Sequence, residues 1–145
     1  MTLPNLRPRL WLFSMTLLLL CNSCKVTLVA PRDSELLGQI ETASQAIDGF
    51  YLKMLDATVR NYAQYSDGYI AIEVQLNAIH DKTRLKQHNA ETVAIADNVR
   101  STWVKYKNEH KAADKLNDGE IRYNSSTMRD FIYALSVAEN AKPAD

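Results

Sequence analysis

The chain has few residues that interrupt regular structure, because its 145 residues include only four glycines and four prolines. With no low-complexity stretch and 46% hydrophobic residues, disorder is a poor expectation. Cysteine is also scarce: Cys21 and Cys24 are the two in the chain, and both lie near the N-terminus. A domain that follows them can contain neither a disulfide nor a thiolate metal site.

Neither sign of charge dominates, because 17 basic and 17 acidic residues cancel. Removal of an N-terminal segment that contains Arg7 and Arg9 would leave 15 basic residues against 17 acidic ones. A slightly acidic domain without a basic face offers little to nucleic acid, so we expect no nucleic-acid partner. The length leaves room for one domain.

The long hydrophobic run of the chain lies at its N-terminus. Arg7 and Arg9 precede an apolar stretch from Leu10 to Leu20, and a short polar end follows. This three-part layout is typical of a secretory signal. As a helix, the apolar stretch would rise about 16 Å, roughly half of the hydrocarbon core of a bilayer. A permanent transmembrane helix is therefore the weaker interpretation.

The polar end of this segment carries a processing motif. Leu20, Cys21, Asn22 and Ser23 lead into Cys24, and together they resemble the lipobox of bacterial lipoproteins. The resemblance implies that the Cys24 thiol takes a diacylglycerol, that a peptidase cuts before Cys24, and that the new amine is acylated. Cys21 is the alternative acceptor, but cleavage there would follow the bulky Leu20. An ordinary signal or a short anchor ending in two small apolar cysteines is the other interpretation.

The lipobox resemblance also implies a location. Two or more acyl chains anchor a protein stably, whereas one chain binds a membrane only marginally. Lys25 follows the cysteine, and it is not the aspartate associated with inner-membrane retention in Gram-negative bacteria. The outer membrane, on its periplasmic face, is thus the expected site. We divide the chain into a signal peptide (1–23), a lipidated tether (24–32) and a helical domain (33–145), with Pro31 marking the boundary.

Beyond the tether, apolar residues recur at steps of three and four, which is the period of an amphipathic helix and not of a strand. The first stripe starts at Leu36, and Asp33 or Ser34 can cap its helix. We expect this helix to continue to about Gln64. A break at 66–68 stays open, because helical spacing runs straight through that segment.

Three further stripes follow. We expect the second helix to reach about Leu85, and the third to run from a cap at Asn89 to near Leu116. A loop at 117–119 and a short fourth helix, capped from the polar run 124–127, complete the chain. Each helix has one apolar stripe, and mutual burial of these stripes predicts an all-α fold, a small antiparallel bundle of three or four helices.

The first third of the chain resembles a family of small, largely uncharacterised bacterial lipoproteins. Their mature chains open with a lipidated cysteine, a Val-Thr-Leu-like segment, an Ala-Pro pair and a long helix. The residues that carry the resemblance are Cys24, 26–28, Ala30, Pro31, Ile47, Phe50 and Leu55. It implies a periplasm-facing helical domain, and no agreed activity comes with it.

The histidines do not form a convincing site in the sequence. His80 and His88 lie eight residues apart, whereas metal ligands on one helix are three or four apart. His110 and Asp114 are four apart, but no nucleophile accompanies them. We interpret all of these as surface residues. We expect no metal, no cofactor besides the covalent lipid, and no enzymatic activity.

Tyr62, Tyr65 and Tyr69 form the one cluster that suggests a partner contact, since tyrosine suits surfaces that are half buried and half wet. Packing within the bundle, with the hydroxyls at its rim, is the favoured interpretation of the three tyrosines. The leading functional hypothesis is a lipid-anchored, non-enzymatic protein that contacts another envelope component. The second hypothesis is a carrier that holds a small apolar ligand near Phe50 and Trp103.

Overall fold

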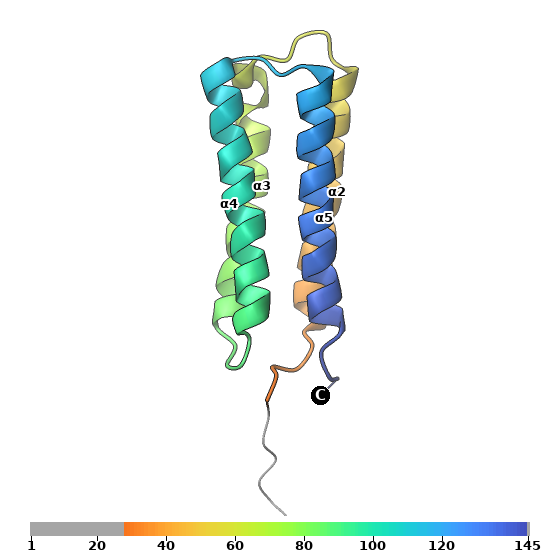
Figure 1. Cartoon of the computed structure of the whole chain (residues 1–145), viewed down its shortest axis with the longest axis vertical. Coiled ribbons are helices and arrows are strands. Elements are labelled where there is room, and N and C mark those ends of the chain that lie inside the picture. The colour runs from red at the N-terminus through yellow and green to blue at the C-terminus, as the bar shows by residue number, and fades with distance from the viewer. Residues whose placement is uncertain (1–27, 145) are drawn as a thin grey trace, which may run out of the picture.

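The computed structural model describes residues 28–144, which fold into four helices joined by short loops. These helices are α2 (Ser34–Asp56), α3 (Tyr62–Arg84), α4 (Ala90–Ala113) and α5 (Asp118–Asn140). They alternate in direction and form an antiparallel bundle (Figure 1). The predicted all-α bundle is confirmed. The signal peptide and Cys24 lie outside the described residues.

Each helix packs against two others, α2 against α3 and α5, and α4 against α3 and α5. The predicted first stripe is buried at Leu36, Ile40, Ala43, Ile47, Tyr51 and Met54. Thr58, its predicted last member, is exposed in the loop after α2. The second and third helices end at Arg84 and Ala113, close to the predicted positions. Among the helices described here, none is long and apolar enough to cross a membrane.

The predicted extension of the first helix to Gln64 was wrong, because α2 ends at Asp56. The segment 66–68 lies inside α3 and does not interrupt it. The reason for the early end is a side chain that reaches back. The Arg60 guanidinium donates at 2.8 Å to each of two main-chain carbonyls at the end of the helix, those of Leu55 and Ala57, and such carbonyls lack helical partners.

The predicted loop at 117–119 and the short fourth helix were also wrong, because α5 already begins at Asp118. The Asn117 side chain accepts from the Glu120 N–H at 3.0 Å, and the Glu120 carboxylate accepts from the Asn117 N–H at 2.8 Å. This reciprocal pair is a capping box, which satisfies two free donors at a helix start. The polar run 124–127 therefore lies within α5 and not before it.

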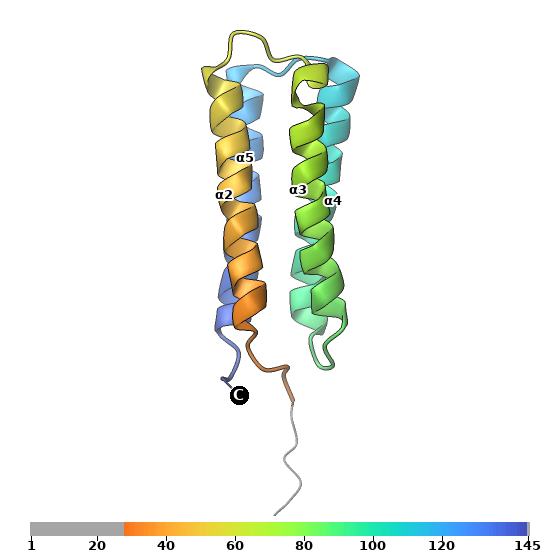
Figure 2. The ribbon, with the colours of Figure 1, turned by 180° about the vertical axis from the view of Figure 1, so that it is seen from behind.

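The two ends of the bundle are formed by different segments of the chain. The loops 57–61 and 114–117 meet at one end, where the Tyr62 N–H donates to the Asp114 carbonyl at 2.9 Å. At the other end lie the incoming tether, the loop 85–89 and the C-terminal segment (Figure 2). We call these the distal end and the tether end.

Candidate functional site

Tyr69 lies inside the bundle and not on a contact surface. It is fully buried, its hydroxyl is 3.2 Å from Nδ1 of His110, and its carbonyl accepts from Trp103 Nε1 at 3.0 Å. Burial raises the pKa of the Tyr69 hydroxyl, because the ionised form would lose its hydration. Tyr69 is thus a packing residue. Tyr62 and Tyr65 are only partly buried beside the core, and they remain candidates for contact.

The rings that were expected to flank a ligand touch each other. Phe50 and Trp103 pack edge to face with ring centroids 5.3 Å apart, and Tyr69 lies 4.6 Å from the Phe50 centroid. The Phe50 ring also lies directly against Gly68, where an added Cβ would be 2.8 Å from Cε2. A ligand between Phe50 and Trp103, as the carrier hypothesis requires, would have to separate these rings.

The interpretation of His110 as a surface residue was wrong. It is fully buried, and Nε2 lies 2.9 Å from the Arg60 carbonyl. Because a carbonyl can only accept, Nε2 carries the proton and Nδ1 accepts from the Tyr69 hydroxyl. Asp114 does not orient the ring; it lies 3.4 Å from the Tyr62 N–H instead. The sequence contained a signal, since His110 continues the buried spacing of Trp103 and its neighbours on α4.

His80 was also expected on the surface, but it is buried between two helices. Its Nδ1 lies 3.5 Å from the Asp81 carboxylate, and its Nε2 lies 3.6 Å from the Asp97 carboxylate of α4. His88 is exposed in the loop 85–89. Within residues 28–144, no three His, Cys, Asp or Glu side chains come together to hold a metal ion.

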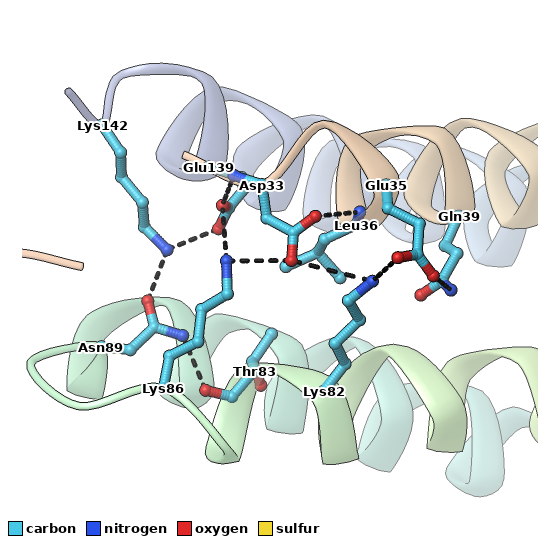
Figure 3. A network of polar contacts seen from close by, with 10 residues as sticks. All are labelled: Asp33, Glu35, Leu36, Gln39, Lys82, Thr83, Lys86, Asn89, Glu139 and Lys142. Atoms are coloured by element: carbon cyan, nitrogen blue, oxygen red, sulfur yellow. Dashed lines mark hydrogen bonds and ion pairs between the residues drawn. The ribbon is translucent and has the colours of Figure 1, made fainter. Parts of the chain in front are cut away.

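A network of charged side chains, of which Glu139 and Lys142 are buried, connects the segments of the tether end (Figure 3). Glu139 of α5 is fully buried; its Oε1 accepts from the Asp33 N–H at 2.8 Å, and its Oε2 lies 2.5 Å from Lys142 Nζ. Lys86 Nζ lies 3.0 Å from Asp33 Oδ2 and 3.7 Å from Glu139 Oε1. With Asn89, these residues form what we call the tether clasp. It connects three segments that are distant in the sequence.

Asp33 confirms the predicted helix cap and belongs to the clasp as well. Its carboxylate accepts from the Leu36 N–H at 2.9 Å. This hydrogen bond, together with the nearby ammonium groups of Lys86 and Lys82, lowers the pKa of Asp33 to about 2, although burial acts in the opposite direction. The acid is therefore ionised at neutral pH and holds both lysines.

Asn89 occupies the predicted cap position of α4, but its side chain does not cap that helix. It donates to the Thr83 carbonyl at 2.7 Å and accepts from Lys142 Nζ. Next to it, the Ala30 N–H of the tether donates to the His88 carbonyl at 3.1 Å. The tether, the loop 85–89 and the C-terminal segment thus form one hydrogen-bonded unit.

A groove of about 840 Å³ between α2 and α5 is lined by apolar side chains and by polar ones, which include Glu41 and the ion pair of Asp48 with Arg129. Tyr133 and Val137 of α5 are 70% and 47% exposed, and Leu37 of α2 lies in the opposite wall. We call this the α2–α5 groove. Sequence reasoning missed it. The signal was two apolar residues four positions apart that lie off the buried stripe of α5.

No protein-family model, curated protein or solved structure matches the chain. The resemblance to small bacterial lipoproteins stays a hypothesis.

Proposed function

We propose that the protein is a lipid-anchored periplasmic protein, held at the outer membrane through acyl chains on Cys24. The proposal rests on the basic and apolar segment that precedes Cys24 and on the small Ser23 before it. The described tether is compatible with an anchor, because it enters the bundle at one end and leaves the long faces of the helices uncovered (Figure 1).

We further propose that the protein acts by contacting another envelope protein and does not catalyse a reaction. The observation that carries this step is the α2–α5 groove, in which Tyr133 is 70% exposed beside Val137. Exposed tyrosine is enriched where proteins bind each other. At about 1.5 Å per residue, the 23 residues of α5 extend over about 34 Å, which is long enough to accept a partner helix.

The arrangement of the buried polar residues favours a role in protein contact over a catalytic role. Tyr69 and His110, the pair that most resembles an acid-base couple, are fully buried and engaged with each other. A substrate would have to open the core to reach them. Membrane confinement raises the local concentration of the groove near other envelope proteins, so a weak interface suffices.

The anchor is tested by labelling cells with radioactive palmitate. Wild-type protein and Cys21→Ala should incorporate label, whereas Cys24→Ala should lose it and accumulate with its signal peptide. Mass spectrometry of purified protein then locates the fatty acid. Recovery of the intact wild-type chain, with its first residues and no fatty acid, would overturn the proposed anchor.

The contact is tested by placing a photo-crosslinking amino acid at Tyr133. Lys105, an exposed residue of α4, is the matched control position. We expect a discrete adduct with an envelope protein from position 133 and none from position 105. Val137→Asp in the same chain should remove the adduct, because the charge opposes apolar contact in the groove. Equal products at both positions would overturn the proposed interface.

A further inference from the structure

Apolar side chains are exposed at the tether end, where a globular domain would normally present polar ones. Leu85, in the loop that follows α3, is 85% exposed. Leu28 and Val29 of the tether are 80% and 48% exposed. Leu28 and Val29 border the same hollow as His88, which belongs to the loop of Leu85. Two segments therefore present apolar groups on one end of the bundle.

Cationic side chains flank the exposed leucine. Arg84 and Lys86 are its neighbours, and residues 82–90 contain no acid; Glu91, in the first turn of α4, is the next one along the chain. Arginine and lysine beside an apolar residue suit the interface of a bilayer, since their stems lie along apolar surface while their charges reach phosphate groups.

The tether clasp holds this loop in place. Asn89 bonds the end of α3 through the Thr83 carbonyl, and the loop carbonyl of His88 accepts from Ala30 of the tether. The acids behind the loop, Asp33 and Glu139, are compensated by lysines. Leu85 is thus presented outward from a loop that the tether clasp holds in place.

The chain length between the anchor and the bundle is short. Residues 25–27 separate Cys24 from Leu28, and four steps of fully extended chain span about 14 Å at most. A bundle held on so short a tether cannot move its tether end far from the acyl chains. With Cys24 acylated, this end is therefore the part of the bundle nearest to the lipid headgroups.

We infer that the tether end is a membrane-contacting surface, in which Leu85 inserts among phospholipid headgroups while Arg84 binds a lipid phosphate and Lys86 stays paired with Asp33. This inference rests on the proposed lipid anchor. It directs the long axis of the bundle away from the membrane. It also leaves the α2–α5 groove accessible to a partner from the side.

The test uses the full, lipidated protein in vesicles of phosphatidylethanolamine and phosphatidylglycerol. With Cys24 acylated, Gln87→Cys introduces a single free thiol beside Leu85, which takes an environment-sensitive fluorophore. Val59→Cys, in the exposed loop at the distal end, is the matched control. We expect a blue shift and quenching by spin-labelled lipid at position 87, and neither at position 59.

A second variant distinguishes the contribution of Leu85 from that of the fluorophore itself. Leu85→Glu in the Gln87→Cys chain should reduce the blue shift, and because Leu85 is exposed it should leave folding intact. Equal, water-like emission at positions 87 and 59 in protein that floats with the vesicles would overturn the inference while the anchor stands. A shift that rises with protein density at fixed lipid would indicate a second copy of the chain, and also overturn it. Protein that carries no lipid and does not float would instead overturn the proposed function.

Discussion

The Tyr69 hydroxyl lies 3.2 Å from Nδ1 of His110, and both side chains are fully buried. The other ring nitrogen of His110 reaches the Arg60 carbonyl at 2.9 Å. This chain of hydrogen bonds links α3 and α4 to the loop that follows α2. It also satisfies both ring nitrogens of a fully buried histidine.

Removal of the Tyr69 hydroxyl should therefore destabilise the fold. Tyr69→Phe leaves the ring in place and deprives His110 Nδ1 of its donor. We expect the free energy of unfolding to fall by about 1–3 kcal/mol, the usual cost of a buried unpaired acceptor. Urea denaturation followed by circular dichroism measures this change. Tyr62→Phe, at a partly exposed ring, is the control and should cost less than about 0.5 kcal/mol; equal costs would contradict the assigned hydrogen bond.

Two glycine-to-alanine substitutions should change the stability of the fold in opposite directions. An alanine Cβ at Gly68 would lie 2.8 Å from Cε2 of Phe50, a ring confined by other aromatic groups, so Gly68→Ala should destabilise by about 1–3 kcal/mol. At Gly49 nothing lies within 4 Å of the added Cβ. Gly49→Ala should therefore stabilise its helix by about 0.5–1 kcal/mol. Thermal unfolding of the two variants gives the sign of each effect, and a stabilised Gly68→Ala would refute the proposed packing.

The stability should depend on pH through Asp33. Its folded pKa of about 2 lies below the ordinary aspartate value of 3.8, so the ionised carboxylate stabilises the folded state. That contribution is complete above about pH 5 and declines as the pH falls toward 2. Asp33→Asn keeps a capping side chain but loses the ion pairs with Lys82 and Lys86. We expect a loss of about 1 kcal/mol at neutral pH.

The same comparison at lower pH tests the direction of this pH dependence. The difference in unfolding free energy between wild type and Asp33→Asn should shrink between about pH 5 and pH 3, because wild-type Asp33 begins to protonate in the unfolded chain. Urea titrations at several pH values measure it. A difference that stays constant over this range would show that Asp33 does not titrate as its contacts require.

Removal of only one partner of the buried pair Glu139 and Lys142 should strongly destabilise the fold. Lys142→Met leaves a fully buried carboxylate without its nearest cation, and we expect a loss of about 3 kcal/mol. The double variant Glu139→Gln with Lys142→Met removes the charge and keeps an acceptor for the Asp33 N–H, so it should recover most of that loss. Chemical denaturation of the single and double variants forms the test. No recovery would mean that lysine packing, and not charge, stabilises the clasp.

The sequence predicted the class of fold because helical periodicity is a local property. Residues such as Leu36, Ile40 and Ile47 recur on one face of one helix, and burial of that face follows from their apolar character. The start of α5 was predicted wrongly, although Asn117 and Glu120 have the spacing of a capping box, which is a local signal. The end of α2 was not readable, because it depends on Arg60, whose guanidinium also pairs with Asp118, 58 residues away.

Among the candidate functional sites, too, some could be predicted from the sequence and others could not. The hypothesis of an anchor at Cys24 comes from neighbouring residues alone, as a signal and its cleavage motif are contiguous. The sequence showed only that the three tyrosines have helical spacing. The packing of the helices determines that Tyr69 lies in the interior. The α2–α5 groove exists because two helices from opposite ends of the domain lie side by side.

The amino-acid order by itself determined which face of each helix is apolar, and therefore that the chain forms a helical bundle. Tertiary structure alone decided which polar groups meet: His110 with Tyr69 across 41 residues, and Glu139 with Asp33 across 106. The physical reason is that a buried polar atom needs a partner in space. A helical stripe shows only that a position is inside, whereas the packing of distant helices selects its neighbour.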